Sequence, residues 1–192
     1  QLDATYEQLN AALGFKTSPV TGLWFNIYGG YQDLKNNLAS AAIANYSGSY
    51  LQLLQGNMHN IYAGAEASYS YKDIISFTAS GIYRDWKTAK TENNSGDQLL
   101  YYMPSFEANF KVDIRPVSSV LINLGYQHIT REKIGNERVD PVGNLYLGGS
   151  YEVFEGISIY VRANNLLNKD YQYYPGYPTE GINFMGGVSF RF

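Results

Sequence analysis

Apolar and polar residues alternate along nine segments of the chain. The last segment, 182–192, shows the pattern most clearly, because Phe184, Val188, Phe190 and Phe192 share one face while Arg191 lies on the other. A strand with a period of two and one wholly apolar face suits a wall between lipid and water. The pattern therefore predicts an all-β protein, a transmembrane antiparallel β-barrel of the bacterial outer membrane.

The charges fall on one face throughout. In the nine segments, none of the outward positions carries Lys, Arg, Asp or Glu; the segments are 9–15, 23–31, 61–71, 75–83, 102–114, 120–126, 145–153, 157–163 and 182–192. A lipid-facing Lys or Arg costs roughly 2 to 4 kcal/mol at mid-membrane. The charged residues are therefore predicted to face the lumen: Glu66, Glu107, Lys111, Asp113, Glu152, Arg162 and Arg191. A soluble sandwich with its apolar faces inward is the alternative.

Short and long connections alternate strictly between these segments. The short ones are 18–22, 72–74, 115–119 and 154–156; the long ones are about 34–59, 86–98, 127–143 and 168–181. Outer membrane barrels have short periplasmic turns and long extracellular loops. Two aromatic girdles result, with Tyr31, Tyr83, Tyr102 and Tyr126 at the outer rim and Phe15, Tyr71, Phe190 and Phe192 at the inner rim. In the longest loop, Tyr50, Leu51, Leu53 and Leu54 are expected to extend the third strand above the membrane.

Composition narrows the classes of function. The 192 residues are 45% apolar and 16% charged, with 19 Tyr, 19 Gly and no Cys, so cysteine chemistry is excluded. The net charge is −3, so the chain lacks the excess of Lys and Arg that binds the phosphates of nucleic acid, and nucleic acid is not expected as a partner. The start of the chain at Gln1 has neither an initiator Met nor a signal peptide, so we expect a processed or excised chain.

The C-terminal motifs resemble a known family. Residues 164–171 read NNLLNKDY, residues 175–178 read PGYP, and residues 187–192 read GVSFRF. These motifs resemble the C-terminus of TonB-dependent outer membrane receptors, although the family places Arg where Ile182 follows Gly181. The resemblance implies a 22-stranded barrel around an N-terminal plug with a TonB box. Residues 1–192 would then be the C-terminal part of the barrel, with the plug and the earlier strands absent.

The function implied by the resemblance is import of a scarce nutrient such as an iron-siderophore, haem or cobalamin. The implied partners are the lipid bilayer, the plug and remaining strands, TonB, the barrel assembly machinery and a small-molecule or metal-chelate substrate. A small structural or adhesive barrel that does not transport is a further alternative. The final strand also resembles the barrel-assembly signal, carried by Gly187, Phe190 and Phe192.

The sequence contains no motif that is typical of an enzyme active site or of a metal site. No G-x-S-x-G run is present, and neither histidine lies in a catalytic motif, so we expect neither an enzyme nor a cofactor. His59 and His128 would need a further ligand to bind a metal, and no metal site is predicted. Contacts with the ligand are expected in the last long loop, from Tyr171, Tyr173, Tyr174 and Tyr177, because tyrosine presents an apolar face with a hydroxyl tip.

Overall fold

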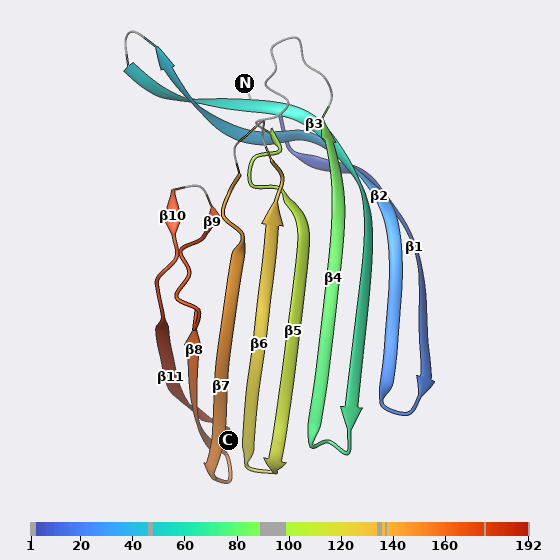
Figure 1. Ribbon diagram of the computed structural model, residues 1–192, viewed down its shortest axis with the longest axis vertical. Helices are drawn as coiled ribbons and strands as arrows, with labels where there is room; N and C mark the ends of the chain where they lie inside the picture. The colour runs from blue at the N-terminus through green and yellow to red at the C-terminus, as the bar shows by residue number, and fades with distance from the viewer. Residues whose placement is uncertain are drawn as a thin grey trace.

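The computed structural model describes residues 3–45, 48–88, 99–133, 136, 138–174 and 176–191, and of residues 39–45 and 48–52 the backbone alone. Within these residues nine strands form one antiparallel sheet in the order β1-β2-β3-β4-β5-β6-β7-β8-β11 (Figure 1). The strands are β1 Tyr6–Val20, β2 Leu23–Asn45, β3 Gly48–Tyr71, β4 Ile75–Thr88, β5 Pro104–Val117, β6 Val120–Arg131, β7 Val142–Phe154, β8 Ile157–Asn164 and β11 Asn183–Phe190. The predicted nine-strand meander is confirmed.

Tight turns join the strands at the end where β11 finishes. They lie at residues 21–22, 72–74, 118–119 and 155–156, as expected from the sequence. Gly22 and Gly156 adopt φ of 83° and 81°, in a region that residues with a Cβ seldom occupy. At the opposite end the connections carry additional structure, including a small hairpin of β9 (Gln172–Tyr174) and β10 (Tyr177–Pro178) between β8 and β11.

The predicted loop over 34–59 is wrong, because most of it is strand. β2 and β3 stay paired as far as Asn45 opposite Gly48, with a register shift between Leu34 and Asn37. Beyond the register shift, the paired ends of β2 and β3 form a ribbon that turns away from the strand direction and runs crosswise beyond the upper end of the sheet (Figure 1). The backbone pairing between two antiparallel strands does not depend on their side chains, so a ribbon beyond the end of the sheet needs no membrane-type alternation. The expected extension of the third strand is confirmed.

Two further boundaries differ from the prediction. Tyr102 precedes β5 in a turn, with φ of 67°, instead of lying on the strand. The turn residues 99–103 fold back onto the sheet, where Leu99 packs against buried Met58 and Trp86. The Trp86 indole N–H also donates to the Pro104 carbonyl at 2.9 Å. The first residues of the predicted strand 102–114 therefore belong to a loop, and these contacts hold that loop against the sheet.

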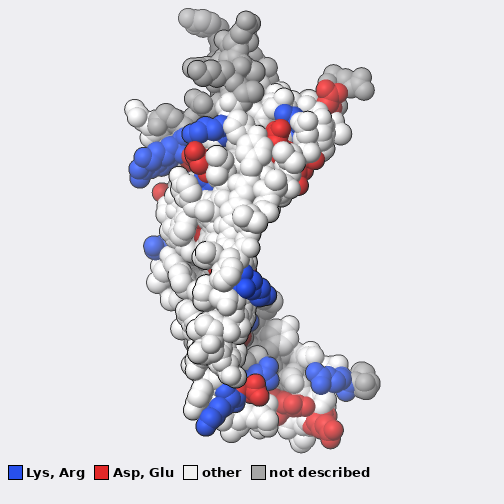
Figure 2. Space-filling model, turned by 90° about the vertical axis from the view of Figure 1, so that its right-hand side faces the viewer, with Lys and Arg blue, Asp and Glu red and all other residues white. Residues whose placement is uncertain are grey.

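The two faces of the sheet have opposite chemistry. Phe77, Phe110 and Ile159 lie on one face and are 40%, 45% and 44% exposed, so they do not meet in a dry core. The second sheet among the described residues is the short β9–β10 hairpin, which is too small to cover that face, so the sandwich alternative is excluded. Figure 2 shows Lys, Arg, Asp and Glu gathered mostly at the two ends of the molecule, with a largely uncharged surface between them. No helix in the described part is long and apolar enough to cross a membrane.

Tyrosine rings on the other face lie over glycines of the neighbouring strand. Tyr28 is opposite Gly64 and Tyr62 is opposite Gly30, and each ring occupies the space that a Cβ on the glycine would need. The same arrangement joins Tyr146 to Gly125 on the adjacent strands β7 and β6, and Tyr160 to Gly187 on β8 and β11. These glycines are therefore fixed by close ring packing across strands.

Candidate functional site

Ion pairs cluster on the face opposite the apolar one. Glu107 pairs with Arg84 of the neighbouring strand β4, and Lys111 Nζ lies 3.0 Å from Asp113 Oδ2. The side chains of Arg84, Glu107 and Asp113 are only 22%, 30% and 28% exposed. The sequence analysis does not include Arg84, because its fourth segment ends at Tyr83. Arg84 is the next position on the inward face of that segment, so a segment one residue longer would have included it.

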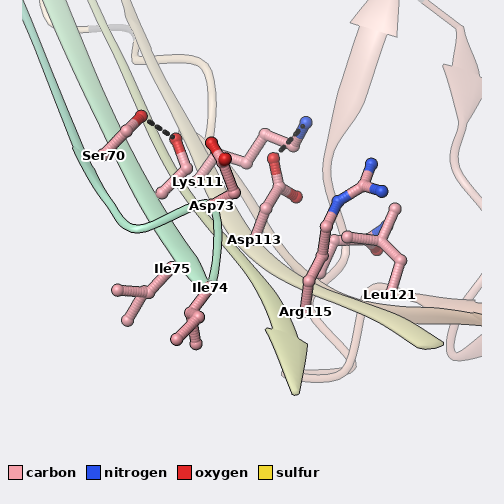
Figure 3. A pocket seen from close by; sticks show the side chains of 10 residues that line it. Ser70, Asp73, Ile74, Ile75, Lys111, Asp113, Arg115 and Leu121 are labelled. Carbon is pink, nitrogen blue, oxygen red and sulfur yellow. Dashed lines mark hydrogen bonds and ion pairs between the residues drawn. The ribbon is translucent and has the colours of Figure 1, made fainter. Parts of the chain in front are cut away.

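A polar pocket of about 550 Å³ lies on this face near the tight-turn end (Figure 3). Its lining is Ser70, Asp73, Ile74, Ile75, Ser76, Lys111, Asp113, Arg115, Leu121 and Asn123. Asp113 Oδ1 is buried without a hydrogen-bond partner among the described residues, while Oδ2 accepts from Lys111. The Arg115 side chain points into the same space as these two residues (Figure 3). The pocket therefore offers one unsatisfied acceptor and a guanidinium to an incoming polar group.

The other predicted inward residues are mostly engaged within the sheet. Arg162 lies 4.1 Å from the centroid of the Tyr146 ring and donates to Asn164 Oδ1 at 2.8 Å. Glu152 accepts from the Gly156 backbone N–H at 3.1 Å, next to the turn. Glu66 lies between Asn26 and Ser80 in register, and the exposed Arg191 follows the end of β11. Arg162 and Glu152 therefore stabilise the sheet directly.

A buried arginine organises the opposite, loop-bearing end. Arg131 is 6% exposed and donates to the backbone carbonyls of Asp140, at 3.1 Å, and Gln172. Its guanidinium also lies 5.4 Å from the centroid of the Tyr102 ring. Burial lowers the pKa of Arg131, and the nearby Tyr102 and Tyr173 oppose that shift. One side chain thus ties three loops together. Arg131 falls in the predicted long loop 127–143, beyond the alternating segment 120–126, so the pattern gave no signal for this role.

The predicted ligand tyrosines divide into two groups. Tyr171 is 5% exposed and packs edge-on against Tyr173, with ring centroids 5.6 Å apart; burial raises the pKa of Tyr171 to about 12. Tyr173 donates to Gln127 Oε1 at 2.8 Å. Tyr174 and Tyr177 face each other across the β9–β10 hairpin and are 73% and 75% exposed. The first pair supports the loop, and the second pair is free to meet a ligand.

A pocket of about 230 Å³ opens where these loops meet. It is lined by Tyr101, Tyr102, Arg138, Val139, Asp140, Asp170, Tyr171, Gln172 and Pro178. The Tyr102 hydroxyl donates to Gln172 Oε1 at 3.2 Å, which fixes one wall. Of the predicted tyrosines only Tyr171 lines it, while Tyr101 and Tyr102 join from a loop that is distant in sequence. Its aromatic and charged lining can hold a planar ligand that carries polar groups.

The histidines stay apart. Tyr31 lies 5.7 Å from His59, and Tyr126 lies 6.3 Å from His128, measured between ring centroids on the apolar face. No group of three or more potential metal ligands occurs in the described parts of the chain. Of the proposed assembly residues, Phe190 is 60% exposed on the apolar face and Gly187 lies under Tyr160; Phe192 is outside the described residues.

Several solved structures share this fold. The copper transporter OprC superposes with a TM-score of 0.71 at 18% identity, covering 95% of this chain and 31% of OprC. The iron transporter FrpB of Neisseria meningitidis gives 0.68 at 14% identity, covering 95% and 31%. The ferric-catecholate import receptor Fiu of E. coli K12 gives 0.67 at 13% identity, covering 95% and 27%. No protein-family model and no curated protein sequence matches the chain.

These neighbours are TonB-dependent receptors, which are transport proteins and not enzymes, in line with the sequence analysis. The chain spans about a third of the length of the receptors it matches. The nine-stranded sheet is open, with β1 and β11 at its edges among the described residues. The chain therefore has the fold of a section of the wall of a bacterial outer membrane β-barrel, the fold on which TonB-dependent receptors are built.

Proposed function

We propose that the chain is the C-terminal part of the barrel of a TonB-dependent receptor that imports a scarce nutrient, such as an iron-siderophore, haem or cobalamin. The observation that carries the proposal is the pairing of an exposed apolar face with an ion-paired polar face on one sheet. Such a sheet separates lipid from an enclosed polar space. The match to receptors for copper and ferric chelates supports a metal-containing substrate.

The two edges of the sheet support completion by further strands. Strand β1 pairs only with β2, and strand β11 pairs only with β8, among the described residues. Unpaired backbone groups cost several kcal/mol each in lipid, so a membrane barrel must close. We infer that the remaining barrel strands cover both edges.

Within this barrel, we assign the polar face to contact with a plug domain. Asp113 Oδ1, which has no partner among the described residues, and the Arg115 guanidinium lie in the pocket near the tight turns, where a plug segment could donate to the first and accept from the second. The other predicted plug contacts lie on or beside the same face: Glu66, Glu107, Lys111, Glu152, Arg162 and Arg191. Of these, Glu107, Lys111, Glu152 and Arg162 already have partners in the sheet. Among these charged residues, Asp113 is the one with a buried oxygen that has no hydrogen-bond partner in the described part of the chain.

Cysteine labelling tests the plug assignment. This chain has no cysteine, so Asn123→Cys places one thiol in the pocket, and Ser119→Cys places a control thiol at the adjacent turn. In the complete receptor we expect a periplasmic maleimide to label position 119 readily and position 123 slowly. Deleting the plug should make the two rates equal. Equal rates in the intact receptor would refute the assignment.

The proposed transport function is tested by measuring uptake in cells. Cells that lack the gene should lose uptake of one compound from a panel of labelled ferric siderophores, haem and cobalamin, and loss of TonB should have the same effect, because the plug is moved through TonB. Replacing both Tyr174 and Tyr177 with Ala should weaken binding of that compound without changing receptor abundance. Unchanged uptake of every compound would favour the non-transporting barrel.

The last strand is proposed as a signal for the barrel assembly machinery. Gly187 has a competing reason to be glycine, since a Cβ there would lie 2.5 Å from the Tyr160 hydroxyl oxygen. Overpacking of this kind costs about 1 to 3 kcal/mol. We therefore expect Gly187→Val to lower receptor stability in membranes, and the added change Tyr160→Ala to restore part of it. If the double variant assembles as poorly as Gly187→Val, the glycine acts in recognition instead of packing.

A further inference from the structure

The apolar face carries a groove at mid-height. It has a volume of about 410 Å³, and its floor on this face consists of Ala65 and Ala67 of β3, Ala79 and Gly81 of β4, and Ala108 of β5. Its walls are Phe25 and Ile27 on β2 and Phe106 and Phe110 on β5. The lining is almost entirely apolar, and the groove opens away from the lumen. A hydrocarbon chain makes more van der Waals contacts in this groove than it would on a flat surface, because the two walls contact it as well as the floor.

The same face becomes charged along β2, β3 and β4, toward the loop-bearing end. Asp33, His59 and Lys87 are opposite one another in register on these three strands. Lys35 Nζ lies 3.0 Å from Asp33 Oδ2, and Lys87 Nζ lies 3.0 Å from Asp85 Oδ1. The Lys87 side chain is 63% exposed. An ammonium has three donors, so one carboxylate leaves it able to bind a second anion, and exposed pairs of this kind are weak.

The spacing between groove and charges matches one membrane leaflet. Lys87 lies six positions beyond Gly81 along β4, which is roughly 20 Å along a strand. With the roughly 45° tilt of barrel strands, that distance rises about 14 Å, close to half of the about 30 Å hydrocarbon core. The groove therefore lies near the membrane centre when the cations lie at headgroup level, with Tyr31 and Tyr83 between them. A lipid of the outer leaflet spans the same two levels.

We propose that this face binds one phosphorylated lipid of the outer leaflet, with an acyl chain in the groove and a phosphate at Lys87, His59 and Lys35. The carboxylates of Asp33 and Asp85 suit a divalent cation bound to that phosphate. The inference goes beyond transport: it rests on the outer membrane fold and needs neither a plug nor a substrate. Its failure and the failure of the proposed function are therefore distinguishable, because uptake is measured separately.

The test titrates the complete, delipidated receptor with bisphosphorylated lipid A and measures bound lipid by native mass spectrometry. Lys87→Ala should weaken binding about fivefold, the effect of one cation near a lipid phosphate. Ala65→Phe should also weaken it by filling the groove floor. Lys72→Ala, at a tight turn, and Ala163→Phe, on the apolar face of β8, serve as matched controls and should bind like the wild type.

The probe itself supplies a second comparison. Dephosphorylated lipid A should bind the wild type at least as weakly as bisphosphorylated lipid A binds the Lys87→Ala variant, because it loses the contacts with all three side chains. Equal binding of the two lipids, or an effect of Ala65→Phe without an effect of Lys87→Ala, would overturn the headgroup assignment. Equal weakening by Ala163→Phe would overturn the groove assignment. Nutrient uptake by the Lys87→Ala variant should be unchanged, which confirms that the variant is folded.

Discussion

Replacing Ala79 with Lys should lower the free energy of unfolding of the receptor in lipid bilayers by about 2 to 4 kcal/mol, whereas Ser80→Lys should change it by less than about 1 kcal/mol. The two residues are adjacent on β4 and differ mainly in face. Ala79 lies opposite Ala67 and Phe110, so an ammonium there would meet only apolar groups and lipid. Ser80 lies opposite Glu66, which can pair with the new cation.

Reversible urea unfolding of the complete receptor in vesicles measures both values, with the slope of the transition checked for equality. Ala79→Leu is the control for size, because it adds volume on the lipid face without charge, and it should be close to neutral. If Ser80→Lys costs as much as Ala79→Lys, or more, the two faces have been assigned the wrong way round. The proposed lipid site and the plug contact would fail with that result.

Replacing Arg131 with Met should release the loops at the extracellular end while the membrane-spanning sheet stays intact. Each hydrogen bond to a charged donor contributes about 1.5 to 3 kcal/mol, so losing the bonds to Asp140 and Gln172 should cost loop docking about 3 to 6 kcal/mol. The Tyr102 ring would also lose its stacked cation. Substrate binding should weaken sharply, since the small pocket lies among these loops.

Hydrogen exchange measures this release at named amides. The Thr179 N–H, bonded to the Tyr171 carbonyl at 3.0 Å, should exchange faster in the variant, while amides of β6 in the membrane should keep their protection. Arg131→Lys is the stringent control, because a single ammonium cannot reproduce the planar fork of a guanidinium. We expect it to resemble Arg131→Met. Unchanged exchange at Thr179 would show that the hairpin is held by its own contacts.

The wall of the barrel was predictable because lipid imposes a period of two. Each outward position from Ile75 to Tyr83 is uncharged, and the inward charges Glu107, Lys111 and Asp113 follow from the same phase. Tight turns were equally predictable, since short connections end the alternation abruptly. The β2 half of the ribbon escaped prediction because it lies outside the alternating segments and is held by backbone pairing, which leaves little mark on side chains.

The candidate sites were harder to predict because they join distant segments. Arg131 binds carbonyls 9 and 41 residues away, and carbonyls carry no sequence signal. Gly30 and Gly64 look like breaks in a strand, yet each is covered by a tyrosine ring from its neighbour. Tyr171 and Tyr174 look equivalent in the sequence, but one is buried and the other is exposed.

The sequence by itself determined which face of each wall strand meets lipid, how many strands the large sheet has and where they turn tightly, because each of these depends on neighbours along the chain and on the solvent. Only the tertiary structure decided the partners of Arg84, Asp113 and Arg131, the course of the β2–β3 ribbon and the meeting of the groove with Lys87. Those features arise from contacts between strands, where register and curvature bring together residues that the linear pattern keeps apart.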